Sequence, residues 1–306
     1  MLLNILLLVI GLVLLIRGAD AFVDGAAALA RRFHIPEIII GLTVIAMGTS
    51  APEAAVSISS ALHGAGGVAI GNALGSNIVN ILLVLGLSAF ITPLTFKNET
   101  VRYEIPFSIF ITIVLMWFGV QYGAITRGGA GVLLLLFTVF IAYLCFDNKY
   151  EKEKSQKIQE LSLTKMILFI VLGISALVLG SDLTVKSATN LATLLHVPNR
   201  IIGLTVIAVG TSLPELVTCI AAARKKHIDL IVGNIIGSNI FNILFVLGIA
   251  GLVRPMAFEY AFAIDAGVSV MVSIMLWLCA IYTQSLSRKM GLLFLICYAG
   301  YLMYLI

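Results

Sequence analysis

The sequence predicts an all-α membrane protein whose ten transmembrane helices form two inverted five-helix repeats. Composition gives the first indication, since 60% of the 306 residues are hydrophobic, only 11% are charged, and the mean hydropathy is +1.11. Soluble proteins have roughly half apolar and about a quarter charged residues. Apolar stretches of about 20 residues, the length a helix needs to cross a bilayer, recur along the chain. A long motif of the first half also returns in the second half.

The apolar stretches have helix length, whereas strands of a membrane barrel would show about ten alternating residues. The predicted spans are residues 2–24, 36–62, 68–92, 104–122, 128–146, 164–186, 199–223, 229–253, 260–283 and 289–306. No Lys or Arg precedes the first span, so the basic start of a cleavable signal peptide is missing and the span is expected to be retained.

A mixed-charge run near the middle divides the chain into three parts. Residues 1–146 form the first five-helix repeat, 147–163 a solvated linker, and 164–306 the second five-helix repeat. We therefore expect both repeats to lie in the lipid bilayer.

The distribution of positive charge predicts the orientation, because cytoplasmic loops carry an excess of Lys and Arg. With ten spans, 14 of the 19 Lys and Arg residues fall on the side of the linker. The linker is thus expected in the cytoplasm and both termini outside, in a multi-pass protein of the cell (plasma) membrane. This bias accounts for the net charge of +4, so the charge gives no reason to expect a nucleic-acid partner.

The repeated motif has two parts with one common offset of 162 residues. GLTVIAMGTSAPE at 41–53 returns as GLTVIAVGTSLPE at 203–215, and GNALGSNIVN at 71–80 returns as GNIIGSNIFN at 233–242. Five predicted spans separate equivalent helices, and an odd number inverts the second copy in the membrane. A duplication that preserved only packing would explain the glycines. It does not explain why the carboxylates are repeated.

The repeated carboxylates, Glu53 and Glu215, lie about midway through their spans. An acidic residue there costs on the order of 2.5–3.5 kcal/mol on insertion scales. No Lys or Arg occupies the middle of the neighbouring predicted spans. The expected partner is therefore a bound cation or a proton.

A proline precedes each glutamate, at Pro52 and Pro214. Proline lacks the amide hydrogen and clashes with the carbonyl four residues earlier, so a break in each helix is expected, which exposes carbonyls from Ala46 and from Ala208 onward. Irregular backbone at membrane depth is tolerated where it is buried or lines a cavity.

The side chains and carbonyls around these breaks offer only oxygen ligands. Such ligands suit Ca²⁺, which takes roughly 6–8 oxygens, as well as Na⁺, and they do not suit zinc or copper. The candidate ligands are Glu53, Glu215, Thr49, Thr211, Ser50, Ser212, the carbonyls of Ala46 and Ala208, Ser76, Ser238, Asn80 and Asn242. Asn77 and Asn239 are expected to satisfy free backbone groups instead.

GTSxPE followed by GNxxGSNIxN, each present twice, resembles the alpha repeats of the cation/calcium exchanger superfamily, and specifically its sodium/calcium branch. The resemblance spans the whole chain, with an alpha-1 motif at 41–80 and an alpha-2 motif at 203–242. It implies an antiporter in which Glu53 and Glu215 bind both Ca²⁺ and Na⁺. By the same resemblance, Thr49, Thr211 and the Ala46 and Ala208 carbonyls complete these sites, Ser76 and Ser238 bind Na⁺, and Ser50 and Ser212 support the glutamates.

Several alternatives remain open from the sequence. Potassium-dependent relatives carry Asp where this chain has Asn242, and the proton-coupled branch typically has Asn near the acidic residue, so both kinds of coupling are disfavoured by the resemblance. A cation channel is the alternative of a different class. No catalytic constellation or cofactor fingerprint occurs, so we expect no enzyme activity, no cofactor and no obligatory protein partner.

The predicted topology can be tested with a single cysteine at Ser155, in a chain from which the four native cysteines have been removed. We expect a membrane-impermeant maleimide to label Ser155→Cys only after the membrane is opened, because the linker is cytoplasmic. Labelling from outside intact cells would contradict this topology.

Overall fold

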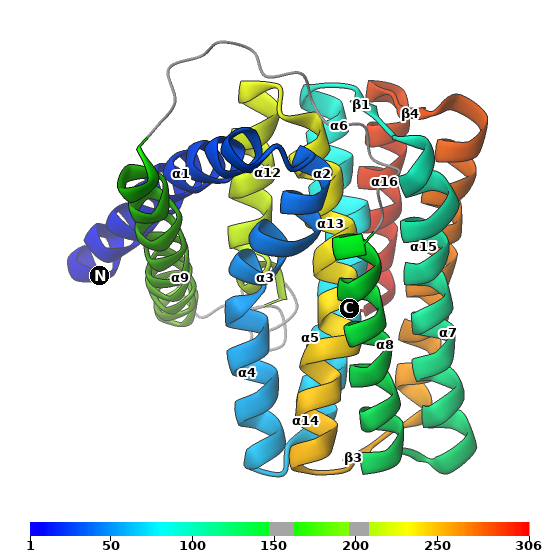
Figure 1. Ribbon diagram of the computed structural model, residues 1–306. Coiled ribbons are helices and arrows are strands. Elements are labelled where there is room, and N and C mark those ends of the chain that lie inside the picture. The colour runs from blue at the N-terminus through cyan, green and yellow to red at the C-terminus, as the bar shows by residue number, and fades with distance from the viewer. Residues whose placement is uncertain (147–161, 196–207, 306) are drawn as a thin grey trace.

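The computed structural model describes residues 1–146, 162–195 and 208–305, and in these ranges the chain is a bundle of helices (Figure 1). The first part contains α1 (Leu2–Phe33), α2 (Glu37–Ile40), η1 (Gly41–Ile45), α3 (Ala46–Thr49), α4 (Ala51–Leu62), α5 (Gly66–Val79), η2 (Asn80–Leu85), α6 (Gly86–Ile91), β1 (Leu94–Thr95), η3 (Thr100–Glu104), α7 (Ile105–Tyr122), β2 (Ala124–Ile125) and α8 (Arg127–Phe146), where η denotes a π-helical turn.

The second part follows the same order of elements where it is described, except that no π-helical turn corresponds to η3. It contains α9 (Leu163–Leu194), α11 (Ala208–Thr211), α12 (Leu213–Lys225), α13 (Ile228–Phe241), η5 (Asn242–Val246), α14 (Leu247–Val253), β3 (Met256–Ala257), α15 (Tyr260–Thr283), β4 (Ser285–Leu286) and α16 (Arg288–Leu305). Most of the predicted linker (147–161) and the start of the second motif (203–207) lie outside the described residues.

The helix that carries the first motif is broken at the predicted place. The segment Glu37–Thr49, which comprises α2, η1 and α3, meets α4 at an angle of 51°. Ser50 lies between them with φ −82° and ψ 11°, and Pro52 occupies the first turn of α4. Proline cannot donate to the preceding turn, so the regular hydrogen-bond pattern stops there.

Helix α13 crosses the first motif at very short range. A Cβ atom on Gly233 would lie 2.5 Å from the carbonyl oxygen of Ile38 and 2.8 Å from Cα of Gly41. On Gly237 it would lie 2.6 Å from the carbonyl oxygen of Leu42. Only glycine permits backbones to approach this closely. The glycines of the second motif therefore bring α13 against η1.

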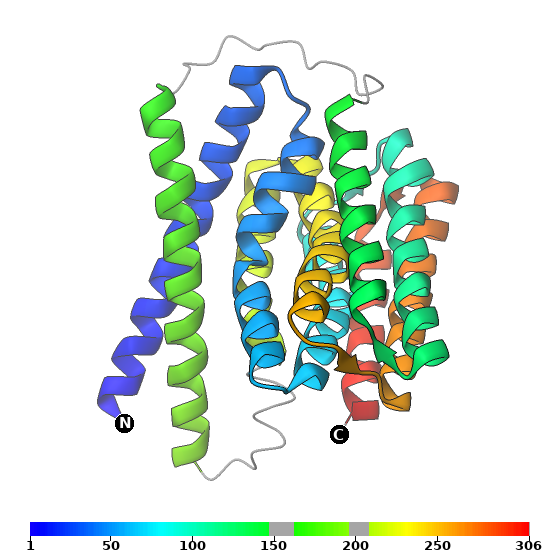
Figure 2. The same cartoon turned by 60° about the horizontal axis from the view of Figure 1, so that its bottom comes forward.

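Helices α1 and α9 are both longer than the predicted spans 2–24 and 164–186, with 32 residues each (Figure 2). They pack side by side through glycines, and a Cβ on Gly18 would lie 3.0 Å from the carbonyl oxygen of Gly173. The predicted end of the first span at residue 24 was wrong as a helix boundary, because the Ala-rich turns that follow continue the helix to Phe33.

Two short ladders join the halves of the chain at opposite ends of the bundle. Strand β1 pairs with β4, and β2 pairs with β3, both antiparallel. Figure 1 shows β1 and β4 at the top and β3 at the bottom. Each ladder thus takes one strand from each half.

The exterior of the bundle is apolar, as a lipid-facing surface requires. Large exposed hydrophobic side chains occur on the outer helices α1, α7, α8, α9 and α15, among them Leu2, Trp117, Leu135, Leu172 and Met271. In the described ranges, seven helices are long and apolar enough to cross a membrane, or eight if the broken pair of Glu37–Thr49 and Ala51–Leu62 counts as one span. The chain is therefore a multi-pass membrane protein.

The close crossing of α13 and η1 generates a prediction for Gly233→Ala. The added methyl group has to displace backbone atoms, so we expect the free energy of unfolding to fall by about 1–3 kcal/mol. Thermal unfolding of the purified protein in detergent measures this as a lower midpoint. The matched control is Gly300→Ala in α16, where no described atom lies within 4 Å of the new Cβ. A midpoint that is unchanged in both variants would contradict the role of this crossing.

Candidate functional site

The two motif glutamates begin the helices that follow the breaks. Glu53 lies in the first turn of α4 and Glu215 in the first turn of α12, and their side chains are 1% and 0% exposed. Ser212 has φ −87° and ψ 9°, nearly the conformation of Ser50, so both copies of the motif break in the same way. A helix N-terminus carries partial positive charge, which partly compensates a carboxylate placed there.

Each glutamate accepts a hydrogen bond from the serine of the other motif. Ser50 Oγ donates to Glu215 Oε1 at 2.7 Å, and Ser212 Oγ donates to Glu53 Oε1 at 3.5 Å. The structure therefore brings together residues that are far apart in the sequence, in one centre shared by the two motifs.

The remaining oxygens of this centre have no protein donor. Oε2 of Glu53 and Glu215 and Oδ1 of Asn80 and Asn242 are all buried, and they accept no hydrogen bond from the described residues. Burying carboxylate and amide oxygens without partners is costly. A cation is a chemical partner that can satisfy acceptors of this kind.

Hydrogen bonds between the first motif and α13 lie beside this centre. Thr49 Oγ1 donates to Asn234 Oδ1 at 3.1 Å, and Ser238 Oγ lies 3.5 Å from the carbonyl oxygen of Ala46. This carbonyl also accepts the backbone N–H of Ser50 at 3.0 Å, so one of its two lone pairs is used within the helix.

Ser76 and Thr211 lie at the edge of the centre, where both line a cavity of about 780 Å³. Residues of α4, α5, α9, α15 and α16 form the rest of its wall, which includes Pro52 and Asp265. Ala208 is the first residue of α11, and its side chain lies outside what the structure describes.

Two supporting residues escaped the sequence reasoning. Asn72 Nδ2 donates to the carbonyl oxygen of Glu53 at 3.3 Å and to Ser57 Oγ at 3.0 Å. Asn234 accepts from Thr49 and donates to Cys219 Sγ at 3.3 Å. The sequence did contain a signal that could have identified them: each follows the first glycine of GNxxGSN, so the asparagine is repeated at the common offset of 162 residues.

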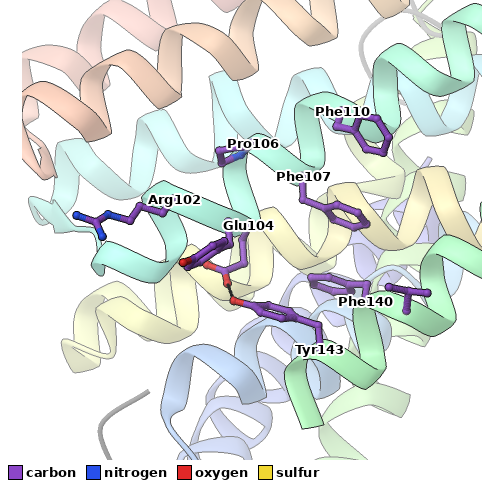
Figure 3. A pocket seen from close by; sticks show the side chains of 9 residues that line it. Arg102, Glu104, Pro106, Phe107, Phe110, Phe140 and Tyr143 are labelled. Carbon is purple, nitrogen blue, oxygen red and sulfur yellow. Dashed lines mark hydrogen bonds between the residues drawn. The ribbon is translucent and has the colours of Figure 1, made fainter. Parts of the chain in front are cut away.

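A second cavity, of about 450 Å³, lies between α7 and α8 and contains none of the predicted site residues (Figure 3). Its buried carboxylate is Glu104, whose Oε1 accepts a hydrogen bond from the Tyr143 hydroxyl at 3.0 Å. The aromatic rings of Phe107 and Phe140 stack beside this pair, with centroids 5.4 Å apart. Glu104 is therefore a buried glutamate separate from the shared centre.

Transition-metal chemistry finds no support in the described part of the chain, which holds no cluster of three or more His, Cys, Asp or Glu side chains suited to a metal. The centre instead combines two carboxylates with hydroxyl and amide oxygens. Such a donor set favours hard cations such as Na⁺ and Ca²⁺.

Comparisons with known proteins agree with this chemistry. The family model described as sodium/calcium exchanger protein matches residues 3–146 and 165–306. The inner membrane protein YrbG of Escherichia coli is 39% identical over 286 residues, which cover 90% of this chain and 87% of that protein. The sodium/calcium exchanger MaX1 of Methanosarcina acetivorans is 30% identical, covering 99% of this chain and 98% of its own length. A solved structure of the sodium-calcium exchanger NCX_Mj, soaked with Na⁺ and Sr²⁺, superimposes with a TM-score of 0.86 at 34% identity, covering 97% of both chains.

The unpaired oxygens generate a binding prediction. A ligand that binds only the folded protein stabilises it, by about 2.7 kcal/mol at 100 times its dissociation constant. We expect Ca²⁺ to raise the thermal midpoint of the purified protein, and Glu53→Gln or Glu215→Gln to abolish this rise, because each removes a charged ligand.

The matched control for this measurement is Glu104→Gln, which also neutralises a buried glutamate but lies in the other cavity. It is expected to keep the Ca²⁺-induced rise. A full Ca²⁺ response in both motif variants would refute the assignment of the centre.

Proposed function

Because this chain belongs to the sodium/calcium exchanger protein family, we propose that it exchanges Ca²⁺ for Na⁺ across the membrane at the centre shared by Glu53 and Glu215. One observation carries the proposal: the serine of each motif donates to the glutamate of the other motif. The family membership confirms the resemblance predicted from the motifs and agrees with a transporter rather than an enzyme.

The proposed ion ligands are those of the sequence analysis. Glu53 and Glu215 supply the charge, and Thr49, Thr211, Ser76, Ser238, Asn80, Asn242 and the carbonyls of Ala46 and Ala208 supply neutral oxygens. Ser50 and Ser212 orient the two carboxylates. Two observations support this set: its described side chains are buried apart from the half-buried Thr211, and Glu53, Glu215, Asn80 and Asn242 each keep an unpaired oxygen.

We infer further that the chain crosses the membrane ten times as two inverted five-helix repeats, with the ion centre near the midplane. Contacts that recur between equivalent elements of the two halves support this inference. The bond from Ser50 to Glu215 has its counterpart in the bond from Ser212 to Glu53, and the ladder β1–β4 has its counterpart in β2–β3. Equivalent elements at opposite ends of the bundle are what an inverted duplication produces.

Charge balance makes the proposed exchange electrogenic. Two ionised glutamates are neutralised by one Ca²⁺, whereas about three Na⁺ in the same centre leave one positive charge. Movement of part of the bundle would expose the centre to alternate sides of the membrane. The buried carboxylates favour such an exchanger over a channel, since a conducting pore is lined continuously.

The orientation that we propose follows the positive-inside rule, with the linker 147–163 in the cytoplasm and both termini outside. In this orientation the chain is a multi-pass protein of the cell membrane. The proposed exchange needs neither K⁺ nor a protein partner.

Transport in vesicles tests the proposed function directly. We expect an outward Na⁺ gradient to drive ⁴⁵Ca²⁺ uptake. Because about three Na⁺ leave for each Ca²⁺ that enters, one positive charge moves outward in each cycle, so a positive potential inside the vesicles should speed uptake and a negative one should slow it. Glu53→Gln and Glu215→Gln should reduce uptake to background, whereas Glu104→Gln keeps it. Wild-type vesicles without Na⁺-driven uptake would refute the exchange.

The neutral amides Asn80 and Asn242 generate a second transport prediction. They add no charge to compensate K⁺ beside Ca²⁺, so uptake should persist when choline replaces K⁺. In Asn242→Asp a third carboxylate enters a buried centre where joint ionisation is unfavourable, so uptake should become more dependent on pH or K⁺. Loss of wild-type uptake in choline would place the chain among potassium-dependent exchangers.

A further inference from the structure

Four buried asparagines connect α5 and η2 with α13 and η5, and all of their side-chain bonds described here run between the two halves of the chain. Asn77 Nδ2 donates to the carbonyl oxygen of Asn239 at 3.1 Å, and Asn239 Nδ2 donates to the carbonyl oxygen of Asn77 at 3.4 Å. Asn242 Nδ2 donates to Asn77 Oδ1 at 3.2 Å, and Asn80 Nδ2 donates to Asn239 Oδ1 at 3.1 Å. All four side chains are at most 2% exposed.

The direction of these bonds follows from the two backbone carbonyls. A carbonyl oxygen accepts hydrogen bonds and cannot donate them, so the amide group facing it must be the NH₂. This requirement fixes the orientation of Asn77 and Asn239. Their oxygens then face Asn242 and Asn80, which must turn their own nitrogens toward them. Two backbone carbonyls thus determine the orientation of four amides.

The consequence is that Asn80 and Asn242 present their oxygens on the opposite side. Both Oδ1 atoms are buried and accept no hydrogen bond within the described ranges, like Oε2 of Glu53 and Glu215. An amide oxygen is a good ligand for Na⁺ or Ca²⁺, whereas an amide NH₂ carries partial positive charge and repels a cation. The orientation of these two amides therefore decides whether they attract or repel the ion.

We propose that Asn77 and Asn239 are positioning residues, which hold Asn242 and Asn80 with their oxygens toward the transported cation. This inference rests on the proposed function and deepens it. The terminal torsion of an asparagine is broad and roughly two-fold, so an unrestrained amide exchanges its oxygen and nitrogen easily. The bonds to Asn77 and Asn239 remove that freedom. They act as the hydrogen-bonding groups behind metal ligands do in other proteins.

The pattern is crossed, and this makes it testable. Asn77 acts on Asn242 in the other half, and not on Asn80, which lies three residues away on the same helix. Asn239 acts on Asn80 in the same way. A residue that merely supported helix packing would not couple selectively to a ligand of the opposite half.

Double-mutant cycles on ion affinity provide the test. The variants are Asn77→Ala, Asn242→Ala, Asn80→Ala and the doubles Asn77→Ala/Asn242→Ala and Asn77→Ala/Asn80→Ala. The readouts are the half-saturating Ca²⁺ and Na⁺ concentrations and the maximum rate of vesicle uptake, together with the shift of the thermal midpoint by Ca²⁺ in detergent.

We expect Asn77→Ala to raise the half-saturating concentration of at least one ion about 10- to 100-fold, with a much smaller change in maximum rate. Adding Asn77→Ala to Asn242→Ala should have little further effect, because the ligand that it positions is already gone. Adding it to Asn80→Ala should multiply the two effects. The mirror cycle of Asn239→Ala with Asn80→Ala must show the same coupling, and it remains available if Asn77→Ala fails to fold.

The positioning role would be overturned if the effects on half-saturating concentration multiplied in the crossed pairs, Asn77 with Asn242 and Asn239 with Asn80. It would also be overturned if the same-helix pair of Asn77 with Asn80 were coupled as strongly as the crossed pairs. Failure of the proposed function looks different, since wild-type vesicles would then show no Na⁺-driven Ca²⁺ uptake. In that case the Ca²⁺-induced shift of the thermal midpoint still reports whether Asn77 and Asn239 act through Asn242 and Asn80.

Discussion

Two carboxylates buried in an apolar bundle, with no protein cation paired to them, impose the constraint on which the rest of this structure depends. Glu53 and Glu215 take part in none of the ion pairs of the described residues. Their stabilisation comes from weaker sources: the start of a helix beneath each carboxylate and a serine hydroxyl from the opposite motif. Partial charges of this kind lower the cost of burial but do not cancel it, so a mobile cation completes the charge balance.

The backbone is adapted to the same requirement. The α3–α4 break places Glu53 at a helix start, and the glycines of α13 allow its polar face to approach the broken segment closely. Thr49 and Ser238 can reach across this contact because no side chain separates the two backbones at Gly233 and Gly237. The same motif therefore supplies both the close helix packing and the polar side chains of the centre, which explains why each glycine of GNxxGSN is followed directly by a polar residue.

Other acidic groups of the chain illustrate the contrast. Asp20 and Asp24 on α1 contact Lys225, with Asp24 Oδ1 2.8 Å from Nζ, and Asp182 pairs with Lys186 at 2.8 Å. These carboxylates have lysine partners, whereas no lysine or arginine of the described residues pairs with the motif glutamates. Burial together with the lack of a cationic partner distinguishes the proposed ion centre from these ion pairs.

The sequence by itself determined the membrane class, the repeated motifs, the break before each glutamate and the oxygen-rich character of the candidate site, because these follow from hydropathy, the offset of 162 residues and the chemistry of proline. It did not determine which residues touch. The crossed bonds of Ser50 and Ser212, the roles of Asn72 and Asn234 and the orientation of four asparagine amides arise where two distant segments meet. The ends of α1 and α9 were also beyond it. Both helices continue past the predicted spans, to Phe33 and Leu194, and Asp20 and Asp24 of α1 pair with Lys225 of another helix. A hydrogen-bond direction or an ion pair depends on the partner that the fold supplies, and only the tertiary structure brings that partner into place.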